Sequence, residues 1–281
     1  NNMLPIIIAF FGAGLIVALV LAIVFGCLDT SNHNSNNTER RNHTESQNRQ
    51  APSRQIVTET EKKGKFGEFL IADCIGQTIP GIQYVINDII FADSYGNSCQ
   101  IDHVVIKRNG IWVIETKNYI GTIYGRCEDR EWTQSLNYGK ETHKLQNPLK
   151  QNQSHIEKLK QRVKFVVEPF NIVVFVKSDI SNLERCRGVC NLEQLKKLLT
   201  MSTGVELLPN QMEQCYNLIC NLKKNNRITP AQHKENVQRQ QQRISNGRCP
   251  RCGGRKIDKN GTYGKFRACS NYPKCTFTMN K

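Results

Sequence analysis

The clearest pattern of apolar and polar positions is a pair of short apolar runs, residues 104–106 and 111–114, on either side of a turn signal. Both runs are rich in Val and Ile, the β-branched residues that pack well in strands. Asn109-Gly110 separates them and favours a two-residue hairpin turn, because both residues tolerate a positive φ. The pattern predicts an antiparallel hairpin with Asn109 and Gly110 as its turn residues.

The polar residues of this hairpin gather at its open end. With the predicted turn, Arg108 faces Ile111. Asp102 then faces Lys117, with Glu115 on the neighbouring diagonal, and the alternation of side chains along strands places all three on one face. Two carboxylates suit Mg²⁺, and a lysine beside them can orient or deprotonate an attacking water or neutralise transition-state charge. An ordinary hairpin with solvated polar ends is the alternative.

The segments around the hairpin predict a mixed sheet flanked by helices. Apolar residues at helical spacing predict a helix over residues 64–75. Its apolar side comprises Phe66, Phe69, Leu70 and Cys74. The unbroken apolar run 171–177 predicts a strand buried on both faces, and a helix before it implies a parallel crossover. Further strands are predicted at 84–91 and 120–125, further helices at 192–199 and 209–224, and a packing anchor at Trp132.

A helix is predicted to begin at Asn147-Pro148, because Asn is a favoured N-cap and Pro fits the first helical position. Gln151 lies in the first turn, where backbone N–H groups favour an anion. From the residues alone, Gln151 is either an ordinary surface glutamine or a group that faces an anionic ligand. His155, one turn further on, is expected to be a surface histidine.

Four short motifs in this region occur in a fixed order. They are Gly64-Lys65-Phe66-Gly67-Glu68, Ile101-Asp102-His103-Val104-Val105, Glu115-Thr116-Lys117 and Asn147-Pro148-Leu149-Lys150-Gln151. Together they cover residues 63–177 and resemble the nuclease-related domain, NERD, of the PD-(D/E)xK superfamily. Ile101 stands where the superfamily motif has proline, a position that is dispensable to the chemistry.

The resemblance implies a restriction-endonuclease-like α/β fold and a metal-dependent nuclease centre. Asp102 and Glu115 would bind Mg²⁺ or Mn²⁺, and Lys117 would assist the attacking water. Glu68 would point at the metal from the first helix, and Gln151 would help to position phosphate or water. For Glu68, an ordinary exposed helix glutamate remains the alternative.

Residues 3–28 are almost wholly apolar and carry no charged side chain. Since about 20 apolar residues cross a bilayer, one transmembrane helix is predicted over 3–28, followed by a disordered tether over 29–54. The next basic residues all follow the apolar run: Arg40, Arg41, Arg49 and Arg54. The positive-inside rule then predicts a single-pass protein of the inner (cytoplasmic) membrane with its other domains in the cytoplasm. A cleaved signal peptide is the alternative, although no Lys or Arg precedes the run.

Residues 248–281 contain two close pairs of cysteines, Cys249 with Cys252 and Cys269 with Cys275. Four thiolates can complete a tetrahedral shell around Zn²⁺, and so short a segment could not otherwise bury enough surface to fold. The rest of the chain's 12 cysteines are scattered without evident partners. We therefore expect a zinc centre and reduced thiols in a cytosolic compartment, rather than a disulfide framework.

The sequence around these cysteines resembles the four-cysteine zinc ribbon of bacterial type IA topoisomerases. The matching segments are 249–254, 264–266 and 268–275. In that family the ribbon binds single-stranded DNA, and the basic and aromatic residues interleaved here suit that partner. The candidate nucleic-acid-binding residues are Arg251, Lys265, Phe266, Arg267, Tyr272 and Lys274. A ribbon that docks onto protein is the alternative.

The net charge of +15 suits a polyanionic partner, either nucleic acid or an anionic membrane. We expect a nuclease-related α/β domain over residues 55–224, a linker over 225–247 and a zinc ribbon over 248–281. The expected activity is Mg²⁺-dependent hydrolysis of DNA phosphodiester bonds. The alternatives are a catalytically silent protein that binds single-stranded nucleic acid and a membrane-surface scaffold. The sequence does not indicate an oligomeric state.

Overall fold

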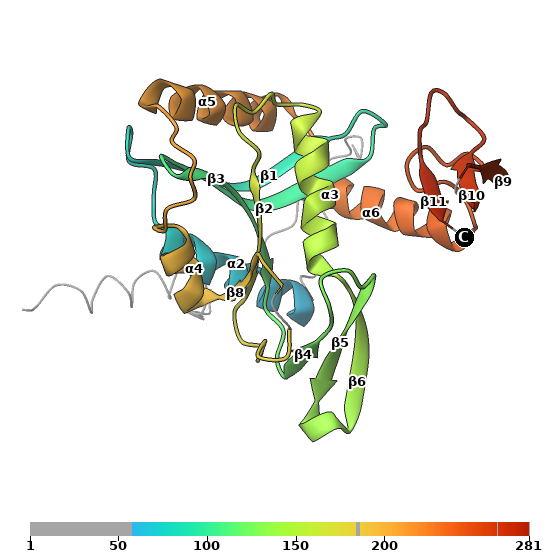
Figure 1. Ribbon diagram of the computed structural model, residues 1–281, viewed down its shortest axis with the longest axis horizontal. Helices are drawn as coiled ribbons and strands as arrows, with labels where there is room; N and C mark the ends of the chain where they lie inside the picture. Colours follow the sequence, from blue (N-terminus) through green and yellow to red (C-terminus); the bar gives the residue numbers. More distant parts are fainter. Residues whose placement is uncertain (1–57, 184–185, 263, 281) are drawn as a thin grey trace, which may run out of the picture. The chain divides into compact units, whose positions relative to one another are not determined.

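The computed structural model describes residues 58–183, 186–262 and 264–280 (Figure 1). The transmembrane helix predicted at 3–28 and the tether predicted at 29–54 lie outside the described residues. Among the helices that are described, none is both long enough and apolar enough to cross a bilayer.

A five-stranded mixed sheet forms the core of the described fold, with strand order β1-β2-β3-β7-β8. The strands are Gln83–Ala92 (β1), Ser98–Lys107 (β2), Gly110–Lys117 (β3), Phe170–Phe175 (β7) and Val189–Asn191 (β8). β1, β2 and β3 are antiparallel, whereas β3 pairs with β7, and β7 with β8, in parallel. The parallel pairing requires a crossover, and the connection between β3 and β7 contains α3 (Pro148–Lys160). The mixed sheet flanked by helices is therefore confirmed.

Helices cover both faces of this sheet (Figure 1). α3 and α5 (Pro209–Asn225) pack on one face, where Val104 belongs to the larger apolar core. α2 (Glu59–Ile75) and α4 (Leu192–Leu198) pack on the other face, where the next residue, Val105, belongs to a second core. This alternation explains why the central strands are almost continuously apolar.

The central hairpin turns one residue earlier than the sequence predicts. Lys107 pairs with Gly110. Arg108 and Asn109 therefore form the turn, and the predicted pairing of Arg108 with Ile111 is wrong. The side chain of Asn109 donates to two backbone carbonyls of the segment around the end of α4, at 2.9 and 3.2 Å, a tertiary contact that the local signal cannot show. The correction moves each partner by two residues and so leaves side chains on their predicted face.

α2 begins at Glu59, before the predicted start, and buries a different side. Phe66 and Phe69, which the sequence places on the apolar side, are 50% and 60% exposed. The buried residues are Gly67, Ile71 and Ile75. A Cβ at Gly67 would lie 2.7 Å from Cβ of Asn118. The helix therefore approaches the end of β3 at its glycine, and this close contact turns the two phenylalanines outward.

A second sheet consists of β4 (Thr122–Tyr124), β5 (Glu131–Leu136) and β6 (Glu141–Gln146), and its last strand leads into α3. Trp132 on β5 is fully buried, as the sequence predicts for a packing anchor. Its ring lies 6.2 Å from that of Phe175 on β7, so the second sheet packs against the end of the first.

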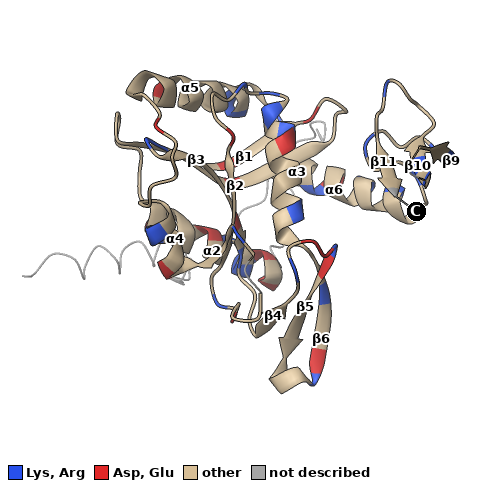
Figure 2. Ribbon diagram, viewed as in Figure 1, with Lys and Arg blue, Asp and Glu red and all other residues tan. Residues whose placement is uncertain are grey.

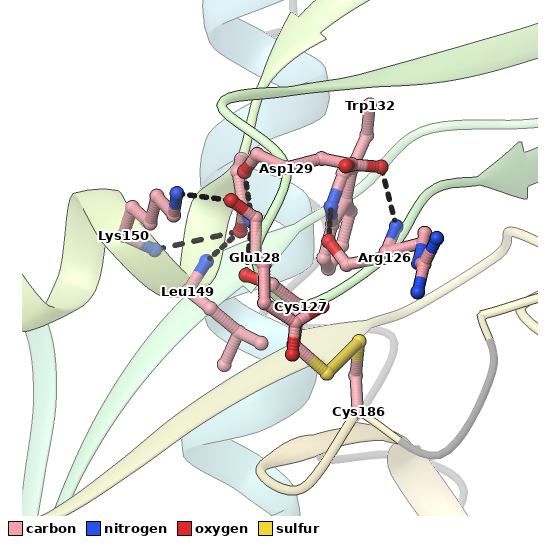
Figure 3. Close-up of a disulfide and its surroundings, with 9 residues drawn as sticks. Arg126, Cys127, Glu128, Asp129, Trp132, Leu149, Lys150 and Cys186 are labelled. Carbon is pink, nitrogen blue, oxygen red and sulfur yellow. Dashed lines mark hydrogen bonds between the residues drawn. A yellow bond between two sulfur atoms is a disulfide. The ribbon is translucent and has the colours of Figure 1, made fainter.

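Cys127 and Cys186 form a disulfide in this region (Figure 3). Their Cα atoms are 5.3 Å apart, although the residues are separated by 59 positions in the sequence. The expectation that these cysteines have no partner is wrong, because only the packing of the β4–β5 connection against the segment before β8 brings them together. Beside the disulfide, Nε1 of Trp132 donates to the carbonyl of Arg126 at 2.8 Å (Figure 3).

The predicted linker after α5 is largely helical, since α6 (Pro230–Ser245) occupies most of it. Thr229 caps this helix by accepting a hydrogen bond from the backbone N–H of Gln232. The C-terminal module that follows has three antiparallel strands, β9 (Lys256–Gly261), β10 (Gly264–Cys269) and β11 (Thr278–Asn280). Basic positions occur on α3, on α6 and in this module (Figure 2).

Candidate active site and zinc centre

Three side chains from β3 and α3 form a closed triangle of hydrogen bonds. Nζ of Lys117 lies 2.7 Å from Oε1 of Glu115 and 3.1 Å from Oε1 of Gln151. Nε2 of Gln151 donates to the same Glu115 oxygen at 2.9 Å. Glu115 and Lys117 share a face because they are two residues apart on a strand. Gln151 reaches them from the first turn of α3, where Asn147 caps the helix by accepting from the N–H of Leu149.

His155 belongs to this cluster, although the sequence predicts a surface histidine. Its side chain is only 16% exposed, and its Nδ1 lies 3.5 Å from Oε2 of Glu115. The two oxygens of Glu115 therefore face different partners, with Lys117 and Gln151 at one and His155 at the other. The spacing of four residues between Gln151 and His155 places both on one side of α3, and this signal could have identified the histidine.

Asp102 joins the cluster where the ladder between β2 and β3 ends. Its Oδ2 accepts the backbone N–H of Thr116 at 2.8 Å. The register places Asp102 across from Glu115, so its predicted pairing with Lys117 is wrong by two residues. Burial and the negative charge of Glu115 raise the pKa of Asp102 well above its ordinary value, despite the hydrogen bond from Thr116.

The pKa values of the neighbouring ion pair shift in favour of its charged form. Burial alone would favour neutral Glu115, but the positive charge of Lys117, aided by His155, lowers the pKa of Glu115 to about 2. Burial likewise opposes the charge of Lys117, but the negative charge of Glu115 outweighs it and raises the lysine's pKa. The cluster therefore combines an ion pair whose charges stabilise each other, Glu115 with Lys117, and an Asp102 whose negative charge is disfavoured by burial and by Glu115.

The donor set fits a divalent cation held by Asp102 and Glu115. These carboxyl groups repel each other, which is one cause of the raised pKa of Asp102, and a cation between them would remove that repulsion. Mg²⁺ and Mn²⁺ suit such carboxylate oxygens, and Mg²⁺ typically binds one or two carboxylates together with water and substrate phosphate. Both residues line a cavity of about 710 Å³, which provides space for those remaining ligands.

Glu68 approaches this site from α2. Its carboxylate pairs with Lys65 at 2.8 Å, and its side chain is 23% exposed. Its negative charge is a further cause of the raised pKa of Asp102. The structure therefore places the negative charge of Glu68 near Asp102, while its carboxylate pairs with Lys65. Glu68 is thus neither an ordinary fully exposed glutamate nor a demonstrated metal ligand.

His103, which follows Asp102, is a buried histidine that sequence reasoning did not single out. It is 2% exposed, and its Nδ1 lies 2.9 Å from Oδ1 of Asn87. Burial, aided by the positive charge of Lys65, lowers the pKa of His103 to about 4. His103 is therefore neutral at physiological pH and takes a structural position beside the acidic cluster.

The four cysteines of the C-terminal module meet as the sequence predicts. Their sulfur atoms all lie within 4.8 Å of one another, and the Cys249 and Cys275 sulfurs are 3.7 Å apart. A tetrahedral Zn²⁺ with Zn–S bonds of about 2.3 Å separates its ligands by roughly this distance. Asn271 supports the site, because its backbone N–H lies 3.4 Å from Sγ of Cys269 and its Nδ2 3.4 Å from Sγ of Cys252. These N–H groups favour the thiolate form that zinc requires.

The structure places the predicted nucleic-acid-binding residues in different surroundings. Tyr272 is 65% exposed, and Nζ of Lys259 lies 5.9 Å from its ring centre. Arg267 pairs with Asp258 at 3.0 Å. Lys265 and Lys274 are exposed, whereas Phe266 is partly buried and a Cβ on Gly261 would meet its ring.

Arg251 lies on the side of the zinc module that contacts the α/β domain. Its guanidinium is 5.8 Å from the ring centre of Tyr95, and its Nη1 donates to Oγ1 of Thr276 at 3.2 Å. It also lines the cavity that contains Asp102 and Glu115. The structure therefore joins this one candidate to the acidic cluster.

Two family models match the chain. The model described as "Nuclease-related domain" matches residues 63–176, and that described as "Topoisomerase DNA binding C4 zinc finger" matches residues 246–281. An uncharacterized protein of Bacillus anthracis is 30% identical over 161 residues, which are 56% of this chain and 75% of the relative.

Shorter similarities link the chain to topoisomerases. DNA topoisomerase 1 of Helicobacter pylori is 59% identical over 29 residues, which are 10% of this chain and 4% of the topoisomerase. The corresponding enzyme of Methanocaldococcus jannaschii is 60% identical over 30 residues, 11% of this chain and 4% of its own length. No solved structure matches the chain.

Proposed function

Because this chain belongs to the family of nuclease-related-domain proteins and carries a topoisomerase-type C4 zinc ribbon, we propose that it is a metal-dependent nuclease that hydrolyses DNA phosphodiester bonds. The observation that carries this proposal is the cluster of Asp102, Glu115, Lys117 and Gln151. A buried ion pair contributes little to stability compared with well-packed apolar residues. Its presence beside a second acid, at a cavity, therefore favours a chemical role.

Each residue of the cluster has a distinct part in the proposed reaction. Asp102 and Glu115 would hold Mg²⁺ or Mn²⁺, which would supply electrophilic activation of the scissile phosphate. Lys117 is a charged donor, since its pKa is raised. It therefore orients the attacking water and neutralises charge that develops on the phosphate, rather than acting as a general base.

Gln151 holds the geometry of this centre, because its two amide atoms bind Glu115 and Lys117 at the same time. Glu68 adds negative charge near Asp102, which strengthens the attraction of the site for a cation. The centre thus depends on side chains from α2, β2, β3 and α3, which only the complete fold brings together.

The test is cleavage of labelled single- and double-stranded DNA by the full chain, with Mg²⁺ or with EDTA. Glu115→Gln should lower metal-dependent cleavage by at least about 10²-fold, the loss typical of removing one transition-state contact. Glu206→Gln is the matched control, because Glu206 is exposed and pairs with Arg108 at the hairpin turn. Salt-sensitive DNA binding by the wild type without any cleavage would favour the catalytically silent alternative.

The zinc ribbon is proposed to bind single-stranded DNA. Lys265 and Lys274 supply exposed positive charge, and Tyr272 offers an exposed ring on which a base can stack. The similarity to topoisomerase ribbons supports this role. Competition between labelled single-stranded DNA and anionic liposomes would separate it from a membrane-surface role.

The apolar run at residues 3–28 supports membrane anchoring, and the basic residues after it support a cytoplasmic position for the other domains. The Cys127–Cys186 disulfide instead favours a position outside the cytoplasm, since disulfides persist mainly in oxidising compartments. Protease treatment of intact and permeabilised cells tests both points. Digestion of the α/β domain only after permeabilisation of the inner membrane is the result that the proposal predicts.

A further inference from the structure

The acidic cluster and the zinc ribbon open onto one shared cavity. Its lining includes Asp102 and Glu115 of the α/β domain and Pro250, Arg251 and Phe277 of the ribbon module. The family match to the nuclease-related domain ends at residue 176, so this cavity is completed by parts of the chain outside that match.

Hydrogen bonds and packing contacts connect the ribbon to the α/β domain through the turn between β1 and β2. Asn97, which is 7% exposed, donates from Nδ2 to the carbonyl of Arg251 at 2.8 Å. Its Oδ1 accepts from Nη1 of Arg243 on α6 at 3.1 Å. Tyr95, from the same turn, packs against the cysteine cluster. One buried amide therefore joins the turn, α6 and the ribbon.

α6 forms one wall of the cavity. The N-terminal half of α6 contacts the main sheet through His233, whose Nδ1 forms a 2.7 Å hydrogen bond with Oγ of Ser98 on β2. The residues that α6 presents to the cavity recur at intervals of three or four and so lie on one face of the helix. They are His233, Val237, Gln240, Gln241 and Ile244. α3 lines the same cavity with Gln151 and His155, so the space passes between two helices.

The chemistry of the lining suits one nucleic-acid strand. Ile244, which is 50% exposed, offers apolar surface to bases, and Arg251, Lys150 and Lys158 offer positive charge to phosphates, although Glu157 also lines the cavity. A volume of about 710 Å³ is that of a pocket for a drug-sized ligand, which has room for a few nucleotides of one strand but not for the full width of a duplex.

We propose that this cavity is the path of a single DNA strand from the zinc ribbon to Asp102 and Glu115, so that single strands and single-stranded flaps are cut in preference to duplex. This inference rests on the proposed nuclease function. It assigns α6, which lies outside the family match, to substrate selection.

The test compares Gln241→Glu with Gln238→Glu in the full chain. Both glutamines are exposed on α6, but only Gln241 lines the cavity, so one carboxylate enters the strand path and the other faces solvent. The readouts are cleavage of a labelled single-stranded oligonucleotide, of its blunt duplex and of bis(p-nitrophenyl) phosphate, and strand affinity by fluorescence anisotropy in Ca²⁺.

The proposal predicts that Gln241→Glu lowers single-strand cleavage and affinity by about tenfold through charge repulsion. Hydrolysis of the small diester should fall much less than single-strand cleavage, because that diester does not occupy the strand path, and Gln238→Glu should match the wild type. Equal behaviour of the two variants on the single strand, or wild-type duplex cleavage as fast as single-strand cleavage, would overturn it. If no variant hydrolyses any substrate but Gln241→Glu still weakens strand binding, the nuclease function fails and the strand path stands.

Discussion

Nζ of Lys117 lies 2.7 Å from Oε1 of Glu115, with the two side chains only 14% and 6% exposed. Removing one partner of a buried pair leaves an uncompensated charge, which costs about 3 kcal/mol or more. Glu115→Gln and Lys117→Met should therefore each lower the free energy of unfolding, whereas the double variant should recover much of that loss. DNA cleavage should be strongly reduced in both single variants and should not recover in the double variant.

Urea unfolding and cleavage assays on these variants make a double-mutant cycle. Full additivity of the two stability losses would mean that the pair does not interact as the structure shows. Recovered cleavage in the double variant would remove both residues from the chemistry.

His155 is expected to hold the second oxygen of Glu115 in position, since its Nδ1 lies 3.5 Å away. His155→Ala should lower the turnover number for DNA cleavage by about 10- to 100-fold, as when a supporting ligand contact is removed. It should also weaken Mn²⁺ binding measured by calorimetry. Gln153→Ala, on the same helix but exposed and outside the cavity lining, is the control and should change neither quantity.

The buried imidazole of His103 predicts a loss of stability in mild acid. Its pKa is about 4 in the folded protein, against an ordinary value of 6.5. Below pH 6.5 the unfolded chain therefore binds a proton at His103 that the folded protein does not bind until about pH 4. The free energy of unfolding falls over this range of pH. Between pH 7 and pH 5 this amounts to about 2 kcal/mol. Urea unfolding of His103→Leu should lack this contribution, and an unchanged pH slope in the variant would contradict it.

Zinc removal should abolish the contribution of the ribbon to DNA binding, because folding of so small a module depends on its metal. Cys249→Ser should weaken single-strand affinity and reduce its dependence on salt, since each lost phosphate contact lowers the slope by about 0.7. Cys220→Ser is the control, because it makes the same substitution on α5, outside the zinc module. Identical salt slopes for the two variants would mean that the ribbon makes no phosphate contacts.

The Cys127–Cys186 disulfide closes a loop of 59 residues. For a loop of this length, removing the bond is expected to lower the free energy of unfolding by about 4 kcal/mol. Thermal unfolding of the Cys127→Ser/Cys186→Ser variant should match that of the reduced wild type. A reductant that leaves the unfolding transition unchanged would show that the bond contributes nothing in solution.

The sequence predicted the hairpin and the shared face of its acidic residues, because apolar runs and side-chain alternation are local properties. It misplaced the turn, since Asn109 is held by carbonyls around the end of α4. The error moved partners by two residues, a full strand period, so the face of Glu115 and Lys117 was still correct. The cysteine ligands of the zinc centre were predictable because their spacing is short.

The missed features all depend on contacts between distant segments. Phe66 and Phe69 have the spacing of a buried stripe, but the close approach of α2 at Gly67 turns them outward. Cys127 and Cys186 meet only after the second sheet has packed. His155 differs, since its spacing from Gln151 could have placed it beside Glu115.

The most direct test of the central claim compares wild type and Lys117→Ala for two properties of the full chain, Mn²⁺ binding and DNA cleavage. Lys117 is a donor rather than a cation ligand, so the account predicts that the variant still binds Mn²⁺ but has lost cleavage of single-stranded DNA. Cleavage at the wild-type rate by Lys117→Ala would contradict the account, because Lys117 would then have no part in the chemistry.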